Sequence, residues 1–218
     1  MDTGGPPPAG FDDLAHAGPL SLEISIGRER LVTNCGAISG GADEWRNVQR
    51  TTAAHSTLSL DNRNSIELIS AGGIGKRRSD VSILRDDDDE NFICTTTHNG
   101  YAEILGTTHS RVIKLSKHSE QLDGIDQLFG RAGQRFDIRF HLHPTVSASI
   151  MQNGNSAILK LPKGGGWQFD SVGAELSLVG SIFLDGGTSR RSKQLVLSGE
   201  TAATETEVSW SIHALSER

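Results

Sequence analysis

The stretch FDIRFHLH at residues 136–143 alternates apolar and polar side chains without a break. In an extended chain successive side chains point to opposite faces, so the apolar residues would share one face and the polar residues the other. The same period of two recurs in Leu20–Ile26 and Val208–Ile212. Such alternation is typical of strands that bury one face and leave the other toward water. The pattern therefore predicts antiparallel β-structure.

Extending this reading along the chain predicts about fourteen short strands, separated by turns rich in Gly, Asn and Asp. Ala102–Leu105 is among the strand candidates, whereas helical period is confined to Gly41–Gln49 and Ser119–Phe129. Strands at this spacing without crossover helices predict an all-β fold, a large antiparallel β-sandwich of two packed sheets. We expect residues 1–12 to form an irregular Gly/Pro-rich leader and residues 13–218 to form the sandwich domain.

Composition narrows the function classes. The 218 residues include 21 Lys and Arg against 27 Asp and Glu, a net charge of −6, which argues against a nucleic-acid partner. No apolar run approaches the roughly 18–20 residues of a membrane helix, so membrane insertion is not expected. The N-terminal residues do not read as a signal peptide, which leaves a cytoplasmic location open. Cys35 and Cys94 belong to no CxxC pair, and two unpaired thiols are expected.

Two of the eight histidines, His141 and His143, lie two residues apart in the alternating stretch. At strand spacing both imidazoles would project from one face, about 7 Å apart. That separation suits two ligands of one metal ion, as in cupin-like barrels. The alternative is a pair of exposed or hydrogen-bonded histidines on the polar face, and it is favoured because no Glu follows at cupin-like spacing.

His16 and His55 each lie in a segment of small residues just before a predicted strand. Small neighbours leave room around an imidazole for a ligand or an ion. Trp45, Arg46 and Arg50 lie nearby in the sequence and offer a flat apolar surface with guanidinium donors, which suit a sugar and its carboxylate. The alternative is a structural Trp–Arg corner that supports a loop.

Taken together, these segments resemble heparinase II/III-like polysaccharide lyases. The resemblance runs from about Gly4 to Trp210 and covers the C-terminal β-sandwich of that family. It is carried by these stretches: Ala15–Glu23, Leu31–Gly36, Glu44–Asn47, Arg50–Thr57, Thr97–Tyr101, Arg139–Pro144 and Gly166–Phe169.

The resemblance implies an activity that these residues do not complete. In the family, a helical toroid precedes the sandwich, and an anionic polysaccharide binds between the two. A base removes the C5 proton of a uronate and an acid protonates the leaving oxygen, with a tyrosine and an Asn or His coming from the toroid. The only tyrosine here is Tyr101. We therefore expect the C-terminal domain of a lyase for uronate-containing polysaccharides, with weak or no activity without the toroid.

The resemblance also assigns residues to the site. His16 and His55 match two family histidines and are the catalytic candidates, with Trp45, Arg46 and Arg50 as substrate-binding candidates. In metal-containing members an aspartate joins the two histidines, and Asn34 stands at that position. An amide oxygen is a weaker donor than a carboxylate, so a divalent metal such as zinc on His16, Asn34 and His55 is an open alternative.

Three hypotheses remain for the function. The first is a lyase portion with a periplasmic or cell-envelope location, whose partners are an anionic polysaccharide and a helical toroid or a second copy of the chain. The second is a non-catalytic carbohydrate-binding or structural sandwich. The third is a cupin-like metal-binding protein built around His141 and His143.

Overall fold

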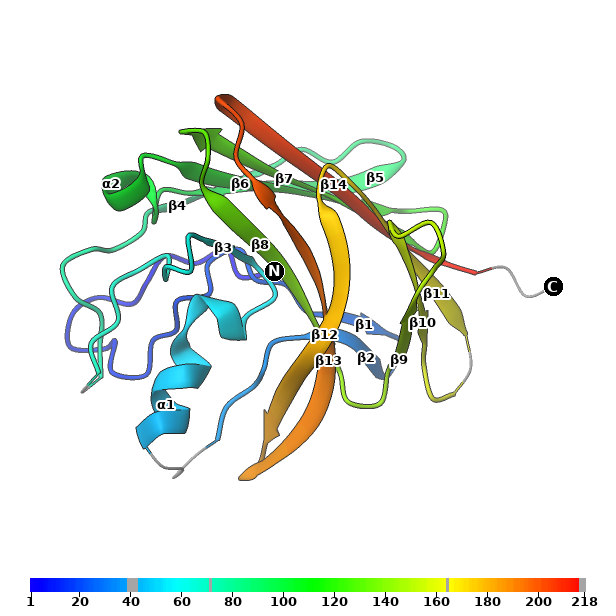
Figure 1. Ribbon diagram of the computed structural model, residues 1–218, viewed down its shortest axis with the longest axis horizontal. Helices are drawn as coiled ribbons and strands as arrows, with labels where there is room; N and C mark the ends of the chain where they lie inside the picture. The colour runs from blue at the N-terminus through cyan, green and yellow to red at the C-terminus, as the bar shows by residue number, and fades with distance from the viewer. Residues whose placement is uncertain (39–42, 71, 164, 216–218) are drawn as a thin grey trace.

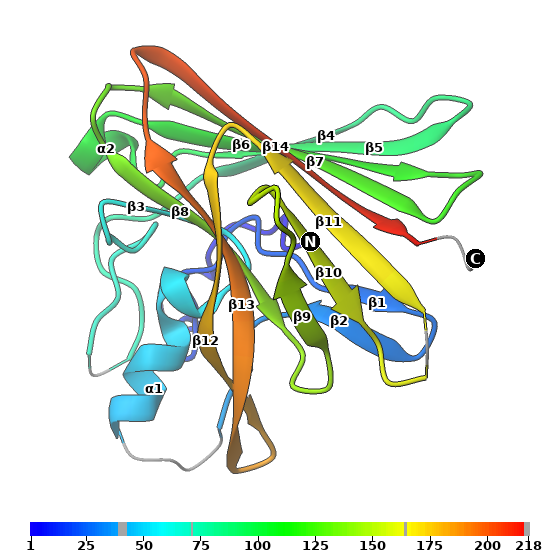
Figure 2. The ribbon, with the colours of Figure 1, turned by 45° about the vertical axis from the view of Figure 1, so that its right-hand side comes forward.

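The computed structural model describes residues 1–38, 43–70, 72–163 and 165–215, and it shows two antiparallel sheets packed face to face (Figure 1, Figure 2). The predicted all-β sandwich is confirmed. In the smaller sheet the strand order is β1 (Ile24–Ile26), β2 (Glu29–Thr33), β8 (Arg135–Leu142), β13 (Thr188–Glu200) and β12 (Glu175–Asp185), and β3 (Leu58–Leu60) also pairs with β8. The larger sheet has eight strands in the order β4 (Val81–Arg85), β5 (Asn91–His98), β6 (Thr108–Ser116), β7 (Gln121–Gly130), β14 (Thr204–Ala214), β11 (Gly166–Val172), β10 (Ser156–Lys160) and β9 (Ser147–Ile150).

The core lies between the sheets and follows the alternation of β8. Its four apolar residues are at most 2% exposed. The ring of Phe140 packs edge-on against Phe169 of β11 at 5.1 Å and against Trp210 of β14 at 4.9 Å, measured between ring centroids. Aromatic side chains bury large areas in this geometry, so this cluster ties the two sheets together.

Residues 119–129, where helical period was noted, are not helical: strand β7 begins at Gln121 and runs through the rest of this segment, so this prediction was wrong. Its inward positions are Gly124, Asp126 and Leu128, all buried. A Cβ at Gly124 would lie 2.1 Å from the indole of Trp210, so glycine provides the space for that ring. Because a glycine and a buried aspartate occupy core positions, the apolar alternation that marks a strand is interrupted.

Two strand predictions near loops also require correction. Ala102–Leu105 is a single helical turn, α2, closed by Gly106 in the left-handed region at φ 69°. The expected strand at Leu20–Ile26 begins only at Ile24. The buried Leu20 has φ 58°, which lies outside the extended region of regular strands.

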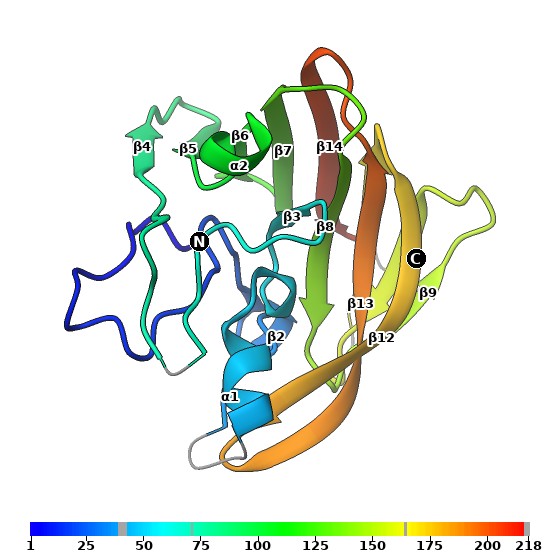
Figure 3. The ribbon, with the colours of Figure 1, turned by 60° about the vertical axis from the view of Figure 1, so that its left-hand side comes forward.

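Helix α1 (Asp43–Arg50) and the short 3₁₀ turn η1 (Thr52–Ala54) lie beside the smaller sheet, near β12 and β13 (Figure 3). The predicted helix at Gly41–Gln49 is confirmed from Asp43 onward, and its first two residues lie outside the described residues. None of the helices that the structure describes has the length and apolarity needed to cross a membrane. The segment from α1 to β3 carries Arg50 and His55 and so positions the candidate site.

Candidate functional site

The structure brings His16 and His55 together. His16 Nδ1 lies 3.0 Å from His55 Nε2, and the two rings meet edge to face with centroids 5.1 Å apart. His55 is buried against the turn η1, whereas His16 is half-buried and lines a pocket of about 260 Å³ together with residues Gly4–Pro7. Two histidines 39 residues apart in the chain therefore act as one unit.

The hydrogen bonds fix which nitrogen of each ring carries the proton. His55 Nδ1 is 2.7 Å from the carbonyl oxygen of Thr51, which can only accept, so Nδ1 donates and Nε2 holds a lone pair. His16 Nδ1 then donates to His55 Nε2, and the lone pair of His16 lies on Nε2. No described residue makes a hydrogen bond to His16 Nε2. His16 Nε2 is therefore the acceptor of the pair that no described residue uses.

Electrostatics keep both rings neutral. Burial, the neighbouring His55 and the Arg50 guanidinium lower the pKa of His16 to about 4. Burial also lowers the pKa of His55, although its bond to the Thr51 carbonyl opposes the shift. At neutral pH the pair is therefore uncharged, the state in which an imidazole serves as a base or a hydrogen-bond acceptor.

Gly18 gives the pair its space. A Cβ at residue 18 would lie 2.5 Å from the His55 ring. Real side chains never approach that closely, so only glycine allows the chain after His16 to pass over the imidazole of His55. This close approach explains the glycine at position 18.

Asn34 lies near the pair but has other bonds. Its Oδ1 accepts the backbone N–H of Ser56 at 2.8 Å, and its Nδ2 donates to Glu23 Oε1 at 3.2 Å. Asparagine suits this position because a carboxylate there could not donate to Glu23. The side chain thus fastens the residue after His55 to the end of β2.

The described residues do not fit a metal centre. Structural zinc sites take four protein ligands, and catalytic ones take three. Two imidazoles are present at this site, the amide of Asn34 is engaged elsewhere, and no group of three or more His, Cys, Asp or Glu side chains that could hold a metal ion occurs among the described residues. We derive no chemistry through a metal.

Of the three substrate-binding candidates, Arg50 has the clearest geometry. Its side chain is 1% exposed, and its three guanidinium nitrogens donate to backbone carbonyls. The acceptors are Ala15 at 2.8 Å, Ile69 at 3.0 Å and Gly73 at 2.6 Å. Arg50 thus holds the loop before His16 in place, as in the structural alternative. On α1, Trp45 is half-buried and Arg46 is exposed.

His141 and His143 have different neighbours. His141 is buried, with its Nδ1 2.8 Å from Ser181 Oγ and 3.4 Å from Cys35 Sγ. His143 Nδ1 instead contacts Thr145 Oγ1 at 2.7 Å. The described residues therefore give no support to the cupin-like hypothesis of a shared metal. Burial lowers the pKa of His141 to about 4.

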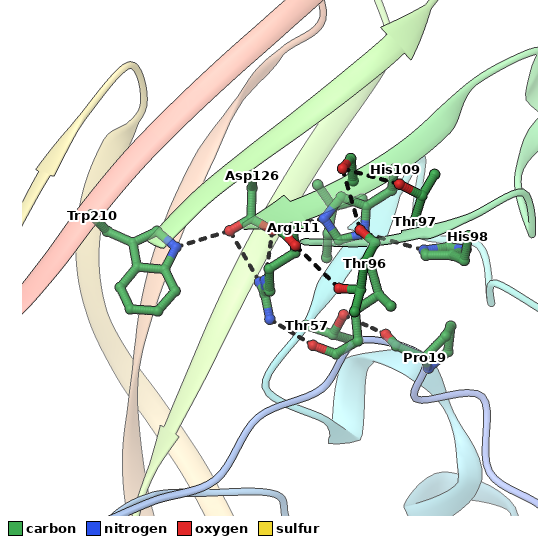
Figure 4. Close-up of polar contacts among 12 residues, drawn as sticks. Pro19, Thr57, Thr96, Thr97, His98, His109, Arg111, Asp126 and Trp210 are labelled. Atoms are coloured by element: carbon green, nitrogen blue, oxygen red, sulfur yellow. Dashed lines mark hydrogen bonds and ion pairs between the residues drawn. The ribbon is translucent and has the colours of Figure 1, made fainter. Parts of the chain in front are cut away.

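A second polar cluster lies fully buried in the larger sheet, and reading the sequence did not find it (Figure 4). Asp126 of β7 accepts from Arg111 Nε at 2.7 Å, His109 Nε2 at 2.7 Å and Trp210 Nε1 at 2.9 Å. His109 Nδ1 in turn lies 3.1 Å from His98 Nε2. We call these five residues the buried network. The burial of a charged pair at this depth requires that every donor be satisfied.

The buried network reaches the candidate site through one side chain. Arg111 Nη1 donates to the carbonyls of Leu20 at 2.9 Å and Ser56 at 3.0 Å. Ser56 follows His55, and Leu20 lies four residues after His16 in the left-handed conformation noted above. The network thus braces both segments that carry the histidine pair. The signal in the sequence that could have revealed the network was Asp126, an aspartate at a position of β7 that faces the core.

Comparison with known proteins gives the family. The sequence profile described as heparinase II/III-like, C-terminal matches residues 1–211. The chain belongs to this family. The resemblance noted in the sequence is therefore confirmed.

The similar proteins include one that is named for its localisation and others that are named as lyases. FtsZ-localized protein C of Caulobacter vibrioides is 31% identical over 217 residues, covering 90% of this chain and 37% of that protein. The chain thus spans little more than a third of this curated relative's length. Among solved structures, heparan sulfate lyase HepC from Pedobacter heparinus aligns with a TM-score of 0.75 at 16% identity, over 93% of this chain and 31% of the lyase. A heparinase III structure aligns with a TM-score of 0.74 at 14% identity, over 93% of this chain and 30% of the heparinase. Identities this low show a shared fold.

Proposed function

We propose that this chain is the saccharide-facing sandwich of a polysaccharide-lyase-related protein. In this proposal it binds a uronate-containing anionic saccharide beside His16. The observation that carries the proposal is the unused lone pair on His16 Nε2, a tautomer that follows from the bond of His55 to the Thr51 carbonyl. Family membership and the lyase-like fold support it.

The chemistry on this side of the site is that of a base. A neutral His16 could take the C5 proton of a uronate or accept a hydrogen bond from a sugar hydroxyl. The exposed Arg46 is the candidate to neutralise the uronate carboxylate, since Arg50 is committed to backbone carbonyls.

The one tyrosine of the chain cannot supply the acid for the leaving oxygen. Tyr101 is fully buried, and its hydroxyl donates to the Leu58 carbonyl at 3.0 Å. Burial also raises its pKa, so it does not exchange protons with a sugar. We therefore propose that β-elimination requires an acid from a helical toroid, and that the chain by itself binds without cleaving.

Titration of the chain with size-defined oligosaccharides of heparan sulfate, alginate and hyaluronate, followed by NMR or calorimetry, tests the proposal. We expect saturable binding of at least one uronate-containing saccharide, weakened about tenfold or more in His16→Gln because a hydrogen bond to the ligand is lost. His118→Gln is the matched control, because His118 is exposed in the turn between β6 and β7. The proposal fails if no saccharide binds, or if His16→Gln and His118→Gln bind equally well.

Ultraviolet absorbance of the unsaturated product tests the catalytic part separately. The chain alone should give no rise in absorbance with saccharides that it binds. A rise that disappears in His16→Gln would show that the chain supplies its own acid, and the binding role would then be extended to catalysis.

A second candidate function is that of a non-catalytic module that is localised by FtsZ. It is favoured because the relative with the higher identity, 31% against 14–16% for the lyases, is named for its localisation by FtsZ. Imaging of a fluorescent fusion together with cosedimentation with FtsZ polymers tests it. Colocalisation with FtsZ supports this candidate, and a distribution independent of FtsZ contradicts it. The same images test the expected periplasmic or envelope location against a cytoplasmic one.

A further inference from the structure

Strand β4 lies at one edge of the larger sheet, and among the described residues only β5 pairs with it (Figure 3). Its residues from Ser82 onward are exposed, and they include Ile83 at 56% and Leu84 at 64%. An edge strand with exposed apolar side chains is a template for pairing with a further strand, and folded proteins usually protect such edges. An edge that keeps two consecutive large apolar residues exposed therefore indicates an interaction surface.

The backbone of β4 can accept one further strand. The carbonyl of Asp80 accepts a hydrogen bond from the residue after β5 at 3.3 Å, and the N–H of Asp86 donates to β5 at 3.2 Å. Successive residues of an antiparallel strand direct their N–H and C=O groups to opposite sides. Because Asp80 and Asp86 bond toward β5, the backbone groups of Val81, Ile83 and Arg85 are directed to the open edge.

Charges of opposite sign flank the strand. The three residues before Ser79, Lys76–Arg78, are all basic, and the five residues after β4, Asp86–Glu90, are all acidic. Lys76 and the five acidic residues are exposed. Two copies of β4 side by side in the same direction would set acid against acid. In the antiparallel arrangement the basic segment of each copy meets the acidic segment of the other, so the edge is complementary to itself.

We propose that β4 pairs antiparallel with β4 of a second copy of this chain, about a two-fold axis at Ile83, and joins the two larger sheets into one. A two-fold interface uses the same patch on both copies, as this edge does. In this register Ile83 meets its own counterpart, and Val81 meets the partner's Arg85. All of these residues direct their backbone groups to the open edge, and three such pairs with two bonds each give about six main-chain hydrogen bonds.

The same register brings side chains together. Ile83 packs against its counterpart, and Leu84 lies across from the partner's Ser82, so both exposed apolar side chains are covered. Lys76 lies close to the acidic turn of the partner, near the partner's Glu90. Exposed ion pairs add little strength but fix orientation and register, which is why the charges select this arrangement.

The interface is small, because each copy contributes one short strand and its flanks. Interfaces that bury less than about 1,200 Å² are weak or transient. We therefore expect a reversible dimer with a Kd of about 10–100 µM. The dimer is independent of the saccharide role proposed for His16.

Sedimentation of the folded chain between about 1 µM and about 1 mM measures the dimer. Ile83→Lys should weaken it about tenfold or more, because a lysine on an edge strand opposes pairing. Val172→Lys is the matched control: Val172 is 70% exposed on β11, which has a strand on either side. It should leave the dimer unchanged. Thermal unfolding of both variants checks that they are folded.

Charge reversal tests the antiparallel register. Lys76→Glu and Glu90→Lys should each weaken the dimer about threefold or more, because each sets like charges together at both ends of the interface. A mixture of the two single variants should dimerise better than either alone, since every contact in the mixed dimer joins opposite charges. The double variant should regain the original affinity. These differences should diminish at high salt.

Amide hydrogen exchange at low and high protein concentration locates the interface. The amides of Val81, Ile83 and Arg85 should exchange more slowly at high concentration, while those of β12, an edge of the smaller sheet, should not change.

Four outcomes would overturn the proposal. The chain could remain monomeric over the whole range, or Ile83→Lys could dimerise as well as Val172→Lys. The mixture of charge variants could associate no better than the single variants. Protection of β9 or β12 in place of β4 would show that a different edge forms the interface.

Discussion

The molecule contains two histidine pairs with almost the same local geometry and opposite surroundings. His16 and His55 meet at 3.0 Å with ring centroids 5.1 Å apart at 80°, and His98 and His109 meet at 3.1 Å with centroids 5.1 Å apart at 88°. The first pair ends on a half-buried imidazole with an unused lone pair. The second is fully buried and ends on Asp126.

Each pair belongs to a relay, a chain of hydrogen bonds through both imidazoles, and the two relays differ in whether the last acceptor is used. In the buried pair, His109 donates to Asp126, His98 donates to His109, and His98 Nδ1 accepts the backbone N–H of Gly100 at 3.1 Å. Every lone pair in that relay is used. The pair of His16 and His55 starts from a backbone carbonyl and leaves its last acceptor open. A chain of hydrogen bonds in which every acceptor is used stabilises a fold, whereas a chain with an unused acceptor can bind or act on a ligand.

The largest loss of stability is expected from a substitution in the buried network. Asp126→Asn removes the charge that pairs with the buried Arg111, and an uncompensated buried charge costs about 3–5 kcal/mol. Denaturant unfolding should show this loss. Asp123→Asn on the same strand is the control and should stay within about 0.5 kcal/mol, because the hydrogen bonds described for the Asp123 side chain come from the exposed Gln121. Equal losses in the two variants would contradict the role of the network.

The second prediction concerns pH. Burial, His109 and Arg111 lower the pKa of His98, and burial lowers the pKa of His109 against the attraction of Asp126. The unfolded chain therefore takes up protons first as the pH falls below about 6.5. The stability that comes from keeping these two histidines neutral is fully present above that pH. Below it, the free energy of unfolding falls by up to about 1.4 kcal/mol per pH unit for each histidine.

Unfolding free energies at pH 7, 6 and 5 measure this slope. His98→Gln should be less stable at pH 7 but show a shallower slope, while His118→Gln at the surface should keep the original slope. A flat profile between pH 7 and 5 would mean that the buried histidines do not stay neutral.

The open pair can be displaced without touching either imidazole. Gly18→Ala places a methyl group against the His55 ring, and overpacking of this kind costs about 1–3 kcal/mol. Chemical shifts of His16 and His55 should change together, and saccharide binding should weaken. Gly180→Ala is the matched control, because its methyl group meets open space. Unchanged histidine shifts in Gly18→Ala would show that the pair is not held as described.

The smallest effect is expected at Asn34. Asn34→Asp sets a carboxylate against Glu23 in place of a donor, and the loss should be about 1 kcal/mol at neutral pH because the contact is exposed. Glu23→Gln in the same chain should restore stability by removing the like charge. Thermal unfolding with and without zinc then tests the aspartate implied by the family resemblance. Zinc should stabilise only the Asn34→Asp variant, and stabilisation of the unaltered chain would contradict the fit described above.

The sequence determined the fold class because alternation is a local property. Each half-buried strand must place apolar side chains at every second position, so FDIRFHLH already contains the core face of β8. The same reasoning failed at residues 119–129, where Gly124 and Asp126 occupy core positions for reasons that lie on other strands. The indole of Trp210 and the guanidinium of Arg111 explain those two residues, and neither is adjacent in the chain.

The sequence also pointed to His16, His55 and Arg50 as residues of one region, through residue type and family resemblance. Only the tertiary structure decided what each one does, because a role depends on which atoms meet. Arg50 is enclosed by three carbonyls, His16 keeps an unused lone pair, and His141 faces a thiol 106 residues away rather than His143. Distances between atoms that are remote in the chain are set by packing, and no local pattern records them.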